Sequence, residues 1–263
     1  MVQELLDPTF DPRAWVPARR RRLLLVAYID LLLFSVPWAL FVSALEAAFP
    51  GLAGLPSATR FLVFALIEGC LLRFRAWSPG ALLLGIRFVP IREHSVAIDR
   101  LWQGLVPYVS RHTKERESWY TLLLATWTLN EGCKSLVRWT LWNPPVPFFG
   151  QATDEVTSAA IYLASGVFEV AIAVWLYRVD LKAALVGVPY NLVQLASAVL
   201  SWQLWDAWVA EMVVRRRNYP GLPIREGEVE WMQALTPELV VGALAVGIVL
   251  LLLAVPRLRQ AAA

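Results

Sequence analysis

Long apolar runs separated by short polar segments make up most of the chain. Two lie in the first half, at about Leu23–Phe49 and Thr59–Phe74. Three follow in the second half, at about Val156–Tyr177, Ala183–Trp205 and Leu239–Val255. A helix that crosses the hydrocarbon of a bilayer needs about 20 mostly apolar residues, so each run predicts a transmembrane helix.

A sixth run, Trp119–Trp142, is less apolar than the others. Lys134 and Arg138 follow Glu131 by three and seven residues, which places all three on one face of a helix. This segment either crosses the membrane or dips into it and returns. Counting it as a crossing, the pattern predicts an all-α integral membrane bundle of about six transmembrane helices.

Two further apolar segments, Leu82–Pro90 and Leu101–Val109, are too short to cross. The second carries Trp102 and Tyr108, whose aromatic side chains favour the headgroup level. We expect both to be interfacial amphipathic segments on the inner membrane surface.

Positive charge indicates which end of the chain faces the cytoplasm. Four consecutive arginines, residues 19–22, precede the first run, whereas residues 50–57 contain no Lys or Arg. The segment after the second run is again strongly basic. By the positive-inside rule, the N-terminus and this segment are cytoplasmic, and no small-residue cleavage pattern indicates a removable signal peptide. The orientation of the last three helices stays open, because it depends on whether residues 119–142 cross.

Composition excludes several classes of protein. Hydrophobic residues make up 58% of the chain and charged residues only 17%, which fits neither a soluble globular domain nor a disordered chain. The net charge of +3 is too small and too scattered for a nucleic-acid partner. Cys70 and Cys133 lie far apart, with no CxxC and no Cys/His cluster. We therefore expect no disulfide, no metal site and no cofactor.

Carboxylates inside the apolar runs are the strongest chemical signal. Asp30 lies about 10 Å beyond the start of the first run, and Glu68 about 8 Å before Arg73 on the returning helix. The two carboxylates should therefore lie at similar depth on antiparallel helices. They either form a buried charge pairing that fixes helix register, with Arg22 or Arg73 as the cation, or bind a cation or proton.

A second polar group lies in the C-terminal half. Glu169 is near the middle of one predicted helix, and Asn191 and Gln194 are near the middle of the next. We expect an interhelical hydrogen bond between Glu169 and Gln194, because it satisfies both groups. A proton or substrate relay is the alternative.

The chain has 13 tryptophans, many of them at the ends of predicted helices. Tryptophan favours the membrane–water interface, so we expect these to be interface anchors. The candidates are Trp77, Trp102, Trp119, Trp202, Trp205 and Trp208. Small residues four apart, such as Ala160 with Ala164 and Ala243 with Gly247, would let helices approach closely, inside the chain or against a partner.

The first half carries two linked motifs. The stretch RRRLLLVAYIDLLLF begins at Arg20 and places Asp30 inside the first helix, and WSPGALLLGIRFV begins at Trp77, one span later. Over about residues 18–145, this pattern resembles the RDD family of bacterial multi-pass membrane proteins. The matching positions are Arg22, Asp30, Ser78, Pro79, Gly80, Gly85 and Arg87.

The chain departs from the family pattern at two places. Ala81 stands where the family usually has a lysine, and Trp142 and Asn143 stand in the closing His-Asp stretch. The resemblance implies a location in the bacterial cytoplasmic (inner) membrane but no reaction, although ion exchange is suggested for some members. It also divides the chain into an RDD-like membrane domain, 1–150, and a C-terminal three-helix membrane region, 151–263.

The motifs give little support for catalysis. GxSxG, GxGxxG and HExxH patterns are missing, so we expect a protein that is not an enzyme. The tryptophan content, the small-residue faces and the incomplete family motif favour a non-catalytic accessory, structural or assembly subunit in the lipid bilayer. Its partners would be other membrane-protein subunits. The alternative is a cation or proton-coupled transporter that uses the intramembrane carboxylates.

Overall fold

The chain forms two compact units, which we describe separately. Unit 1 comprises residues 1–34 and 57–119, and unit 2 comprises residues 35–56 and 120–263. The division follows Trp119, whereas the sequence analysis places a boundary after residue 150. The computed structural model describes residues 15–18, 20–49, 59, 62–67, 78–90, 105–110, 118–141, 144–218 and 226–262.

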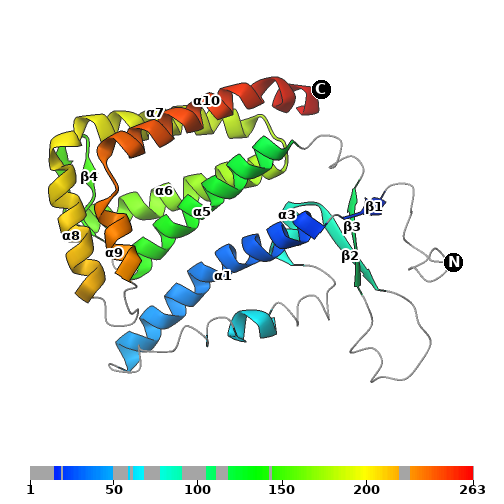
Figure 1. The fold of residues 1–263 in the computed structure, drawn as a ribbon, viewed down its shortest axis with the longest axis horizontal. Coiled ribbons are helices and arrows are strands. Elements are labelled where there is room, and N and C mark those ends of the chain that lie inside the picture. Colours follow the sequence, from blue (N-terminus) through cyan, green and yellow to red (C-terminus); the bar gives the residue numbers. More distant parts are fainter. Residues whose placement is uncertain are drawn as a thin grey trace. The chain divides into compact units, whose positions relative to one another are not determined.

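Unit 1 combines the first part of a long helix with a short helix and a small antiparallel sheet (Figure 1). Its elements are β1 (Trp15–Pro17), α1 (Arg20–Ala48), α3 (Pro79–Leu83), β2 (Ile86–Pro90) and β3 (Leu105–Ser110). The strand order is β1-β3-β2, and both pairings are antiparallel. Helix α1 continues into unit 2 from Ser35.

The sheet corrects the all-α prediction for this part of the chain. Strands β2 and β3 lie where interfacial amphipathic segments are expected, and buried Ile86 and Val109 face each other in the ladder. Short runs rich in β-branched and aromatic residues fit a strand, and hydropathy alone does not distinguish them from a short helix. Gly85, with φ of 60°, makes the turn from α3 into β2 in a conformation that suits glycine.

The second apolar run of the sequence is described only at residue 59 and over residues 62–67, which are helical. The Phe64 ring lies 5.5 Å from the Phe34 ring of α1, a favourable separation for an aromatic pair. Glu68, Arg73 and Trp77 lie outside the described residues, as does Trp102.

Unit 2 is a group of helices with one short hairpin and one 3-10 turn. Its elements are α5 (Trp119–Leu141), β4 (Pro147–Phe148), β5 (Gln151–Ala152), α6 (Glu155–Tyr177), α7 (Lys182–Leu200), the 3-10 turn Trp202–Leu204, α8 (Trp205–Asn218), α9 (Glu226–Gln233) and α10 (Pro237–Ala262). Helix α7 packs against both α6 and α10, and Figure 1 shows α7 and α10 side by side.

Four described segments are long and apolar enough to cross a membrane. They are Arg22–Val42, Glu155–Tyr177, Lys182–Leu200 and Pro237–Pro256. These four segments correspond to the first apolar run of the sequence and to its last three, at about Val156–Tyr177, Ala183–Trp205 and Leu239–Val255. The described residues are therefore mostly helical, with the long apolar helices expected of a membrane protein.

Helix α5 is a single uninterrupted helix of 23 residues, as a segment that crosses the membrane would be. It is not among the four apolar segments, and it carries Glu131, Lys134 and Arg138.

Helices α8 and α9 were not expected from the sequence. Buried residues recur every three or four positions on α8, and Met212 and Val213 pack against Met232 of α9 in a small core. Polar and charged residues occupy the positions between, so no long apolar run marks either helix.

Helix α6 begins at a well-defined cap. The Asp154 side chain accepts a hydrogen bond from the Thr157 backbone N–H at 2.6 Å. This hydrogen bond lowers the pKa of Asp154, because it favours the ionised carboxylate.

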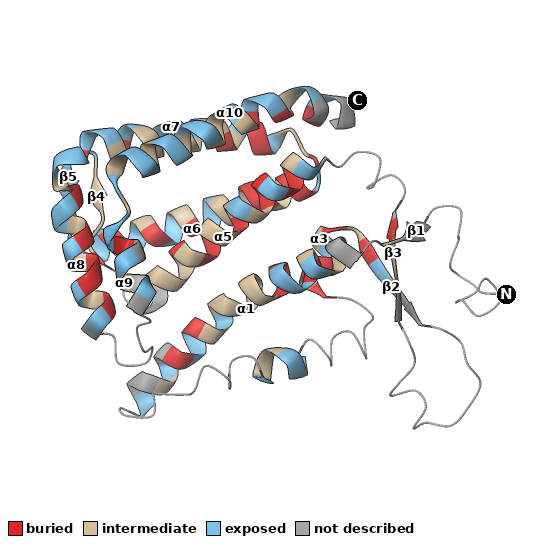
Figure 2. Cartoon of the chain, in the orientation of Figure 1, coloured by how far each residue is buried: buried red, intermediate tan, exposed pale blue. Residues whose placement is uncertain are grey.

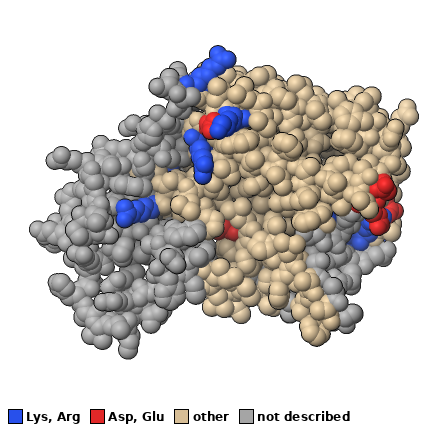
Figure 3. Space-filling view, turned by 180° about the vertical axis from the view of Figure 1, so that it is seen from behind, with Lys and Arg blue, Asp and Glu red and all other residues tan. Residues whose placement is uncertain are grey.

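Much of each long helix is exposed (Figure 2), and many of the exposed residues are large and apolar. Leu185 on α7 is 65% exposed and Leu253 on α10 is 62% exposed. On the face in Figure 3, the described charged side chains form only a few small groups. Such surfaces are typical of helices surrounded by lipid, whose tails are as apolar as leucine.

Candidate functional site

The first candidate site surrounds Asp30 in unit 1. This carboxylate is only 3% exposed and faces the start of α3. Its Oδ2 accepts a hydrogen bond from Ser78 Oγ at 2.6 Å, and its Oδ1 accepts one from the Gly80 backbone N–H at 2.5 Å. Ser78 is also the N-cap of α3, because its Oγ accepts from the Ala81 N–H at 3.2 Å. A buried carboxylate thus accepts hydrogen bonds from one free backbone N–H of a helix start and from the hydroxyl of the N-cap residue.

Gly80 is the point of closest approach between α3 and α1. A Cβ at this position would lie 2.7 Å from the Val26 carbonyl oxygen and 3.0 Å from each Asp30 carboxylate oxygen. Any larger residue would push α3 away from the carboxylate. Pro79, at the first turn of α3, has no N–H to satisfy and therefore suits the position.

The structure thus brings together several residues that the sequence analysis singled out, but with roles it did not assign. Ser78 and Gly80 hold Asp30, Gly85 ends α3, and Arg87 is exposed on β2. Among the described residues, Asp30 makes no ion pair. Arg22 lies two turns before it on α1. The pairing of Asp30 with Glu68 and Arg73 concerns residues outside the described part of the chain.

The second candidate site is a polar network in unit 2, centred on Glu169 of α6. Its Oε1 accepts a hydrogen bond from Tyr190 Oη on α7 at 3.0 Å, and its Oε2 accepts one from Ser135 Oγ on α5 at 3.3 Å. Gln194 Nε2 donates to Tyr190 Oη at 2.9 Å and to Ser165 Oγ at 3.1 Å. The network therefore joins three helices.

This geometry corrects the expected hydrogen bond between Glu169 and Gln194. The two side chains are linked through the Tyr190 hydroxyl, because the longer tyrosine side chain, one turn before Gln194 on α7, reaches the carboxylate first. Asn191 takes no part in the network. It donates instead to the Gly187 carbonyl of its own helix at 2.8 Å.

Glu169 lines a cavity of about 500 Å³. The polar lining residues recur every three or four positions on each of three helices, so each helix turns one polar face inward. They include Thr128, Glu131, Lys134, Ser135 and Arg138 on α5; Tyr162, Ser165 and Glu169 on α6; and Tyr190, Asn191, Gln194 and Ser197 on α7, with Ser201 directly after its end. Helix α10 covers the cavity with apolar and small residues, including Ala243, Gly247 and Leu251.

Close packing of α5 on α6 shapes this cavity. A Cβ on Gly132 would lie 3.0 Å from Glu169 Cβ, and one on Gly166 would lie 2.6 Å from Leu136 Cγ. Two glycines therefore let the helices approach closely next to the carboxylate.

Three charged residues of α5 line the cavity in addition to Glu169. Glu131 and Lys134 form an ion pair at 2.8 Å, and both side chains are about 40% exposed, at 39% and 41%. Arg138, one turn further, has no carboxylate within ion-pair distance in the described part of the chain. No group of three His, Cys, Asp or Glu side chains among the described residues is placed to hold a metal ion.

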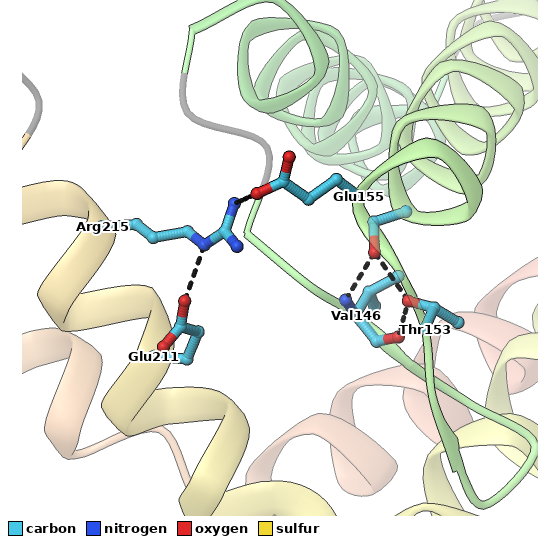
Figure 4. A network of polar contacts seen from close by, with 6 residues as sticks. Val146, Thr153, Glu155, Glu211 and Arg215 are labelled. Atoms are coloured by element: carbon cyan, nitrogen blue, oxygen red, sulfur yellow. Dashed lines mark hydrogen bonds and ion pairs between the residues drawn. The ribbon is translucent and has the colours of Figure 1, made fainter.

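A network of polar contacts surrounds the first turns of α6 (Figure 4). Arg215 of α8 reaches Glu155 of α6 at 2.9 Å and Glu211 of its own helix at 2.7 Å. Ser158 Oγ accepts from the Val146 N–H at 3.1 Å and shares a 2.6 Å hydrogen bond with Thr153 Oγ1. These contacts tie α8 and the segment before α6 to the first turns of α6.

The β4–β5 hairpin is attached to the end of α7. Its turn residues Phe149 and Gly150 have φ of 49° and 78°, the left-handed pair typical of a tight hairpin turn. Their backbone N–H groups donate to Ser197 Oγ at 3.1 Å and Ser201 Oγ at 3.0 Å. These two serines therefore attach the hairpin turn to the end of α7.

The predicted tryptophan anchors differ in exposure. Trp119 and Trp202 are exposed, as an interface anchor requires. Trp205 is buried, and its indole N–H donates to the Leu235 carbonyl at 2.8 Å. Trp208 packs edge-on against Trp205, with ring centroids 4.7 Å apart. These two residues stabilise the packing of α8, where the sequence analysis predicts anchors.

Sequence reasoning missed Tyr162, Ser165 and Tyr190 of α6 and α7, and Ser135 of α5. The sequence does contain a pattern that could have identified them, because polar residues recur every three or four positions within these otherwise apolar runs. Comparisons with known protein families, with curated proteins and with solved structures find no match to this chain. We therefore infer the function of the two sites from their geometry.

Proposed function

We propose that the chain is a multi-pass membrane carrier that binds a small polar solute in the cavity of unit 2. Transport would be coupled to a proton or a cation through Glu169. One observation carries this proposal: a carboxylate within an apolar helix lines a 500 Å³ cavity formed by the polar faces of three helices. Ionisable groups inside membrane helices are costly, and they are most often found where a solute, ion or proton passes.

Glu169 suits a coupling role better than Asp30. Asp30 is enclosed, and both of its oxygens are held by donors fixed in α3. The partners of Glu169 are two hydroxyl groups, those of Ser135 and Tyr190. A hydroxyl can rotate from donor to acceptor, so the same partners serve the ionised and the protonated carboxyl. The proposal thus keeps the transporter alternative of the sequence analysis but changes the residue that carries it.

The remaining expectations fit this proposal. Binding and release of a solute require no catalytic step and no cofactor, so the chain is proposed not to be an enzyme. We propose membership of the RDD family, which the hydrogen bonds from Ser78 and Gly80 to Asp30 support because they join its two motifs. We also propose a bacterial cytoplasmic membrane location, a cytoplasmic N-terminus and six spans. The two further spans would be α5 and the run around residues 62–67.

A second candidate function is the accessory subunit. Ala160 and Ala164, four residues apart on α6, are both exposed. Small residues at this spacing let a helix of another membrane protein approach closely. Gentle solubilisation and affinity isolation would return a larger complex at fixed stoichiometry if this were the main function. The carrier proposal expects a monomer or homo-oligomer.

Flux through proteoliposomes tests the carrier proposal. Purified protein is reconstituted, and uptake of ²²Na⁺ and movement of protons, followed with an enclosed pH dye, are measured under an imposed gradient. We expect Glu169→Gln to reduce the coupled flux at least about tenfold.

Glu238→Gln is the matched control, because Glu238 is an exposed carboxylate in the first turn of α10 and lies outside the cavity lining. It should retain most of the flux, as should Asp30→Asn. Wild-type protein without proton or sodium flux, or equal losses for Glu238→Gln and Glu169→Gln, would contradict the proposal.

A further inference from the structure

Two buried polar groups at one end of the cavity have no hydrogen-bond partner. Tyr162 of α6 is 4% exposed, and its hydroxyl is unpaired, as is the indole N–H of Trp208 on α8. The Trp208 indole N–H lies close enough to act on the Tyr162 hydroxyl oxygen, although the two groups do not have the geometry of a full hydrogen bond. Both residues line the cavity. Buried polar groups are nearly always satisfied, so two unpaired ones in the same cavity indicate an absent acceptor.

Arg138 adds a positive charge to the same place. It lines the cavity from the last turn of α5 and is close enough to Tyr162 to act on it electrostatically. Glu155 and Glu211 are bound to Arg215, and the carboxyl that interacts electrostatically with Arg138 is that of Glu169, without an ion pair between them. Arginine and the indole N–H can only donate, and a tyrosine hydroxyl donates readily, so the group is rich in donors and poor in acceptors.

We propose that Arg138, Tyr162 and Trp208 bind the anionic group, a carboxylate or phosphate, of the carried solute. An oxyanion supplies several acceptor lone pairs, and it pairs with a guanidinium through short, charge-assisted hydrogen bonds. This inference rests on the proposed function and deepens it, because it names the class of solute.

The position of this anion subsite also restricts the length of the solute. Tyr162 and Glu169 are seven residues apart on α6, which corresponds to about 10 Å along the helix axis. The Tyr162 hydroxyl and the Glu169 carboxyl therefore lie about two helical turns apart along the cavity, and Arg138 is close enough to act on both. A solute that reaches both carries an anion near Tyr162 and an amine or another hydrogen-bond donor near Glu169, with an apolar middle against α10.

Equilibrium binding to the purified full-length protein in neutral detergent tests the inference. The probes are 6-aminohexanoate, which carries both groups, hexanoate, which carries only the anion, hexylamine, which carries only the cation, and inorganic phosphate. We expect 6-aminohexanoate to bind most tightly. Arg138→Gln and Tyr162→Phe should each weaken 6-aminohexanoate and hexanoate about tenfold and leave hexylamine unchanged. Glu169→Gln should weaken 6-aminohexanoate and hexylamine instead.

Tyr162→Phe is informative because it removes a hydroxyl that has no partner, so its melting temperature should equal that of the wild type. The matched control is Tyr177→Phe. Tyr177 is also buried on α6, but its hydroxyl bonds to Thr126 Oγ1 at 2.9 Å and lies outside the cavity lining. This control should lose stability and keep full affinity for hexanoate.

Several results would overturn the inference. If hexylamine bound and hexanoate and phosphate did not, the anion subsite would be wrong while the carrier proposal stood. Unchanged hexanoate affinity in both Arg138→Gln and Tyr162→Phe would have the same meaning. Hexanoate binding that disappears in nanodiscs of phosphatidylglycerol, but not of phosphatidylcholine, would assign the subsite to a lipid headgroup and refute the assignment to a solute.

Discussion

Replacing Gly80 by alanine should destabilise unit 1, because no space exists for a methyl group at this position. The new Cβ would lie 2.7 Å from the Val26 carbonyl oxygen and 3.0 Å from both carboxylate oxygens of Asp30. Two of these atoms belong to a buried carboxylate and one to helix backbone, so none can move aside as the end of a flexible side chain would. Helix α3 must therefore shift away from α1, which lengthens the Gly80 N–H hydrogen bond to Asp30.

The size of the loss in stability follows from two unfavourable effects and one favourable effect. Overpacking of a fitted contact costs about 1–3 kcal/mol. Weakening a hydrogen bond to a carboxylate costs about 1–2 kcal/mol more, since such bonds contribute about 1.5–3 kcal/mol when intact. Alanine favours a helix over glycine by about 1 kcal/mol, which offsets part of the loss. The net loss should be about 1–4 kcal/mol in the free energy of unfolding.

Unfolding of the full-length protein in mixed micelles, titrated with sodium dodecyl sulfate and followed by circular dichroism, measures this difference. Gly242→Ala is the matched control, because it lies in α10 and a Cβ there would meet no atom within 4 Å. It should be neutral or slightly stabilising. A Gly80→Ala protein as stable as the wild type would refute the geometry of the Asp30 site.

Three further changes test the packing around the cavity and the caps of its helices. Gly166→Ala should cost about 1–3 kcal/mol in the same unfolding assay, because its Cβ would lie 2.6 Å from Leu136 Cγ and force α5 from α6; an unchanged free energy would contradict the close helix packing. The lowered pKa of Asp154 means that its contribution to α6 is complete above the usual aspartate pKa and is lost as the pH falls through the lowered value. Asp154→Ala should therefore flatten the dependence of the melting temperature on pH between about 5 and 2, and an unaltered slope would be inconsistent with the cap. Trp205→Phe should cost about 1–2 kcal/mol, because it leaves the Leu235 carbonyl without its indole donor, whereas Trp202→Phe on the exposed side should cost little.

The long helices could be predicted from the sequence because their signal is local. The apolar runs predicted for α6, α7 and α10 agree with the helices of the structure within a few residues at most of their ends. An apolar helix is long enough to cross a bilayer once it has about 20 residues, so the length and composition of a run suffice for the prediction. The strands β2 and β3 could not be predicted in this way. Their pairing joins segments about 20 residues apart, and a hydropathy pattern does not contain that contact.

The same distinction applies to the two sites. The sequence correctly predicts that Asp30 is a buried carboxylate. Its partners, however, were predicted from residues at a similar expected depth in the membrane. They lie instead about 50 residues away, in Ser78 and Gly80. Glu169 was likewise identified, whereas Tyr190 was not, because a tyrosine within an apolar run does not look polar. Its role follows only from the packing of α6 on α7.

The central claim is that unit 2 encloses a cavity that water and a polar solute enter within the membrane. Cysteine labelling in proteoliposomes tests it most directly, with Cys70 and Cys133 replaced by alanine. Gln194→Cys lies in the cavity lining, whereas Val193→Cys, its neighbour on α7, is 48% exposed but lies outside the lining. The account predicts that a membrane-impermeant cationic thiol reagent modifies position 194 and not position 193, because position 193 faces lipid. Modification of 193 without 194, or of neither, would contradict the cavity as the site of transport.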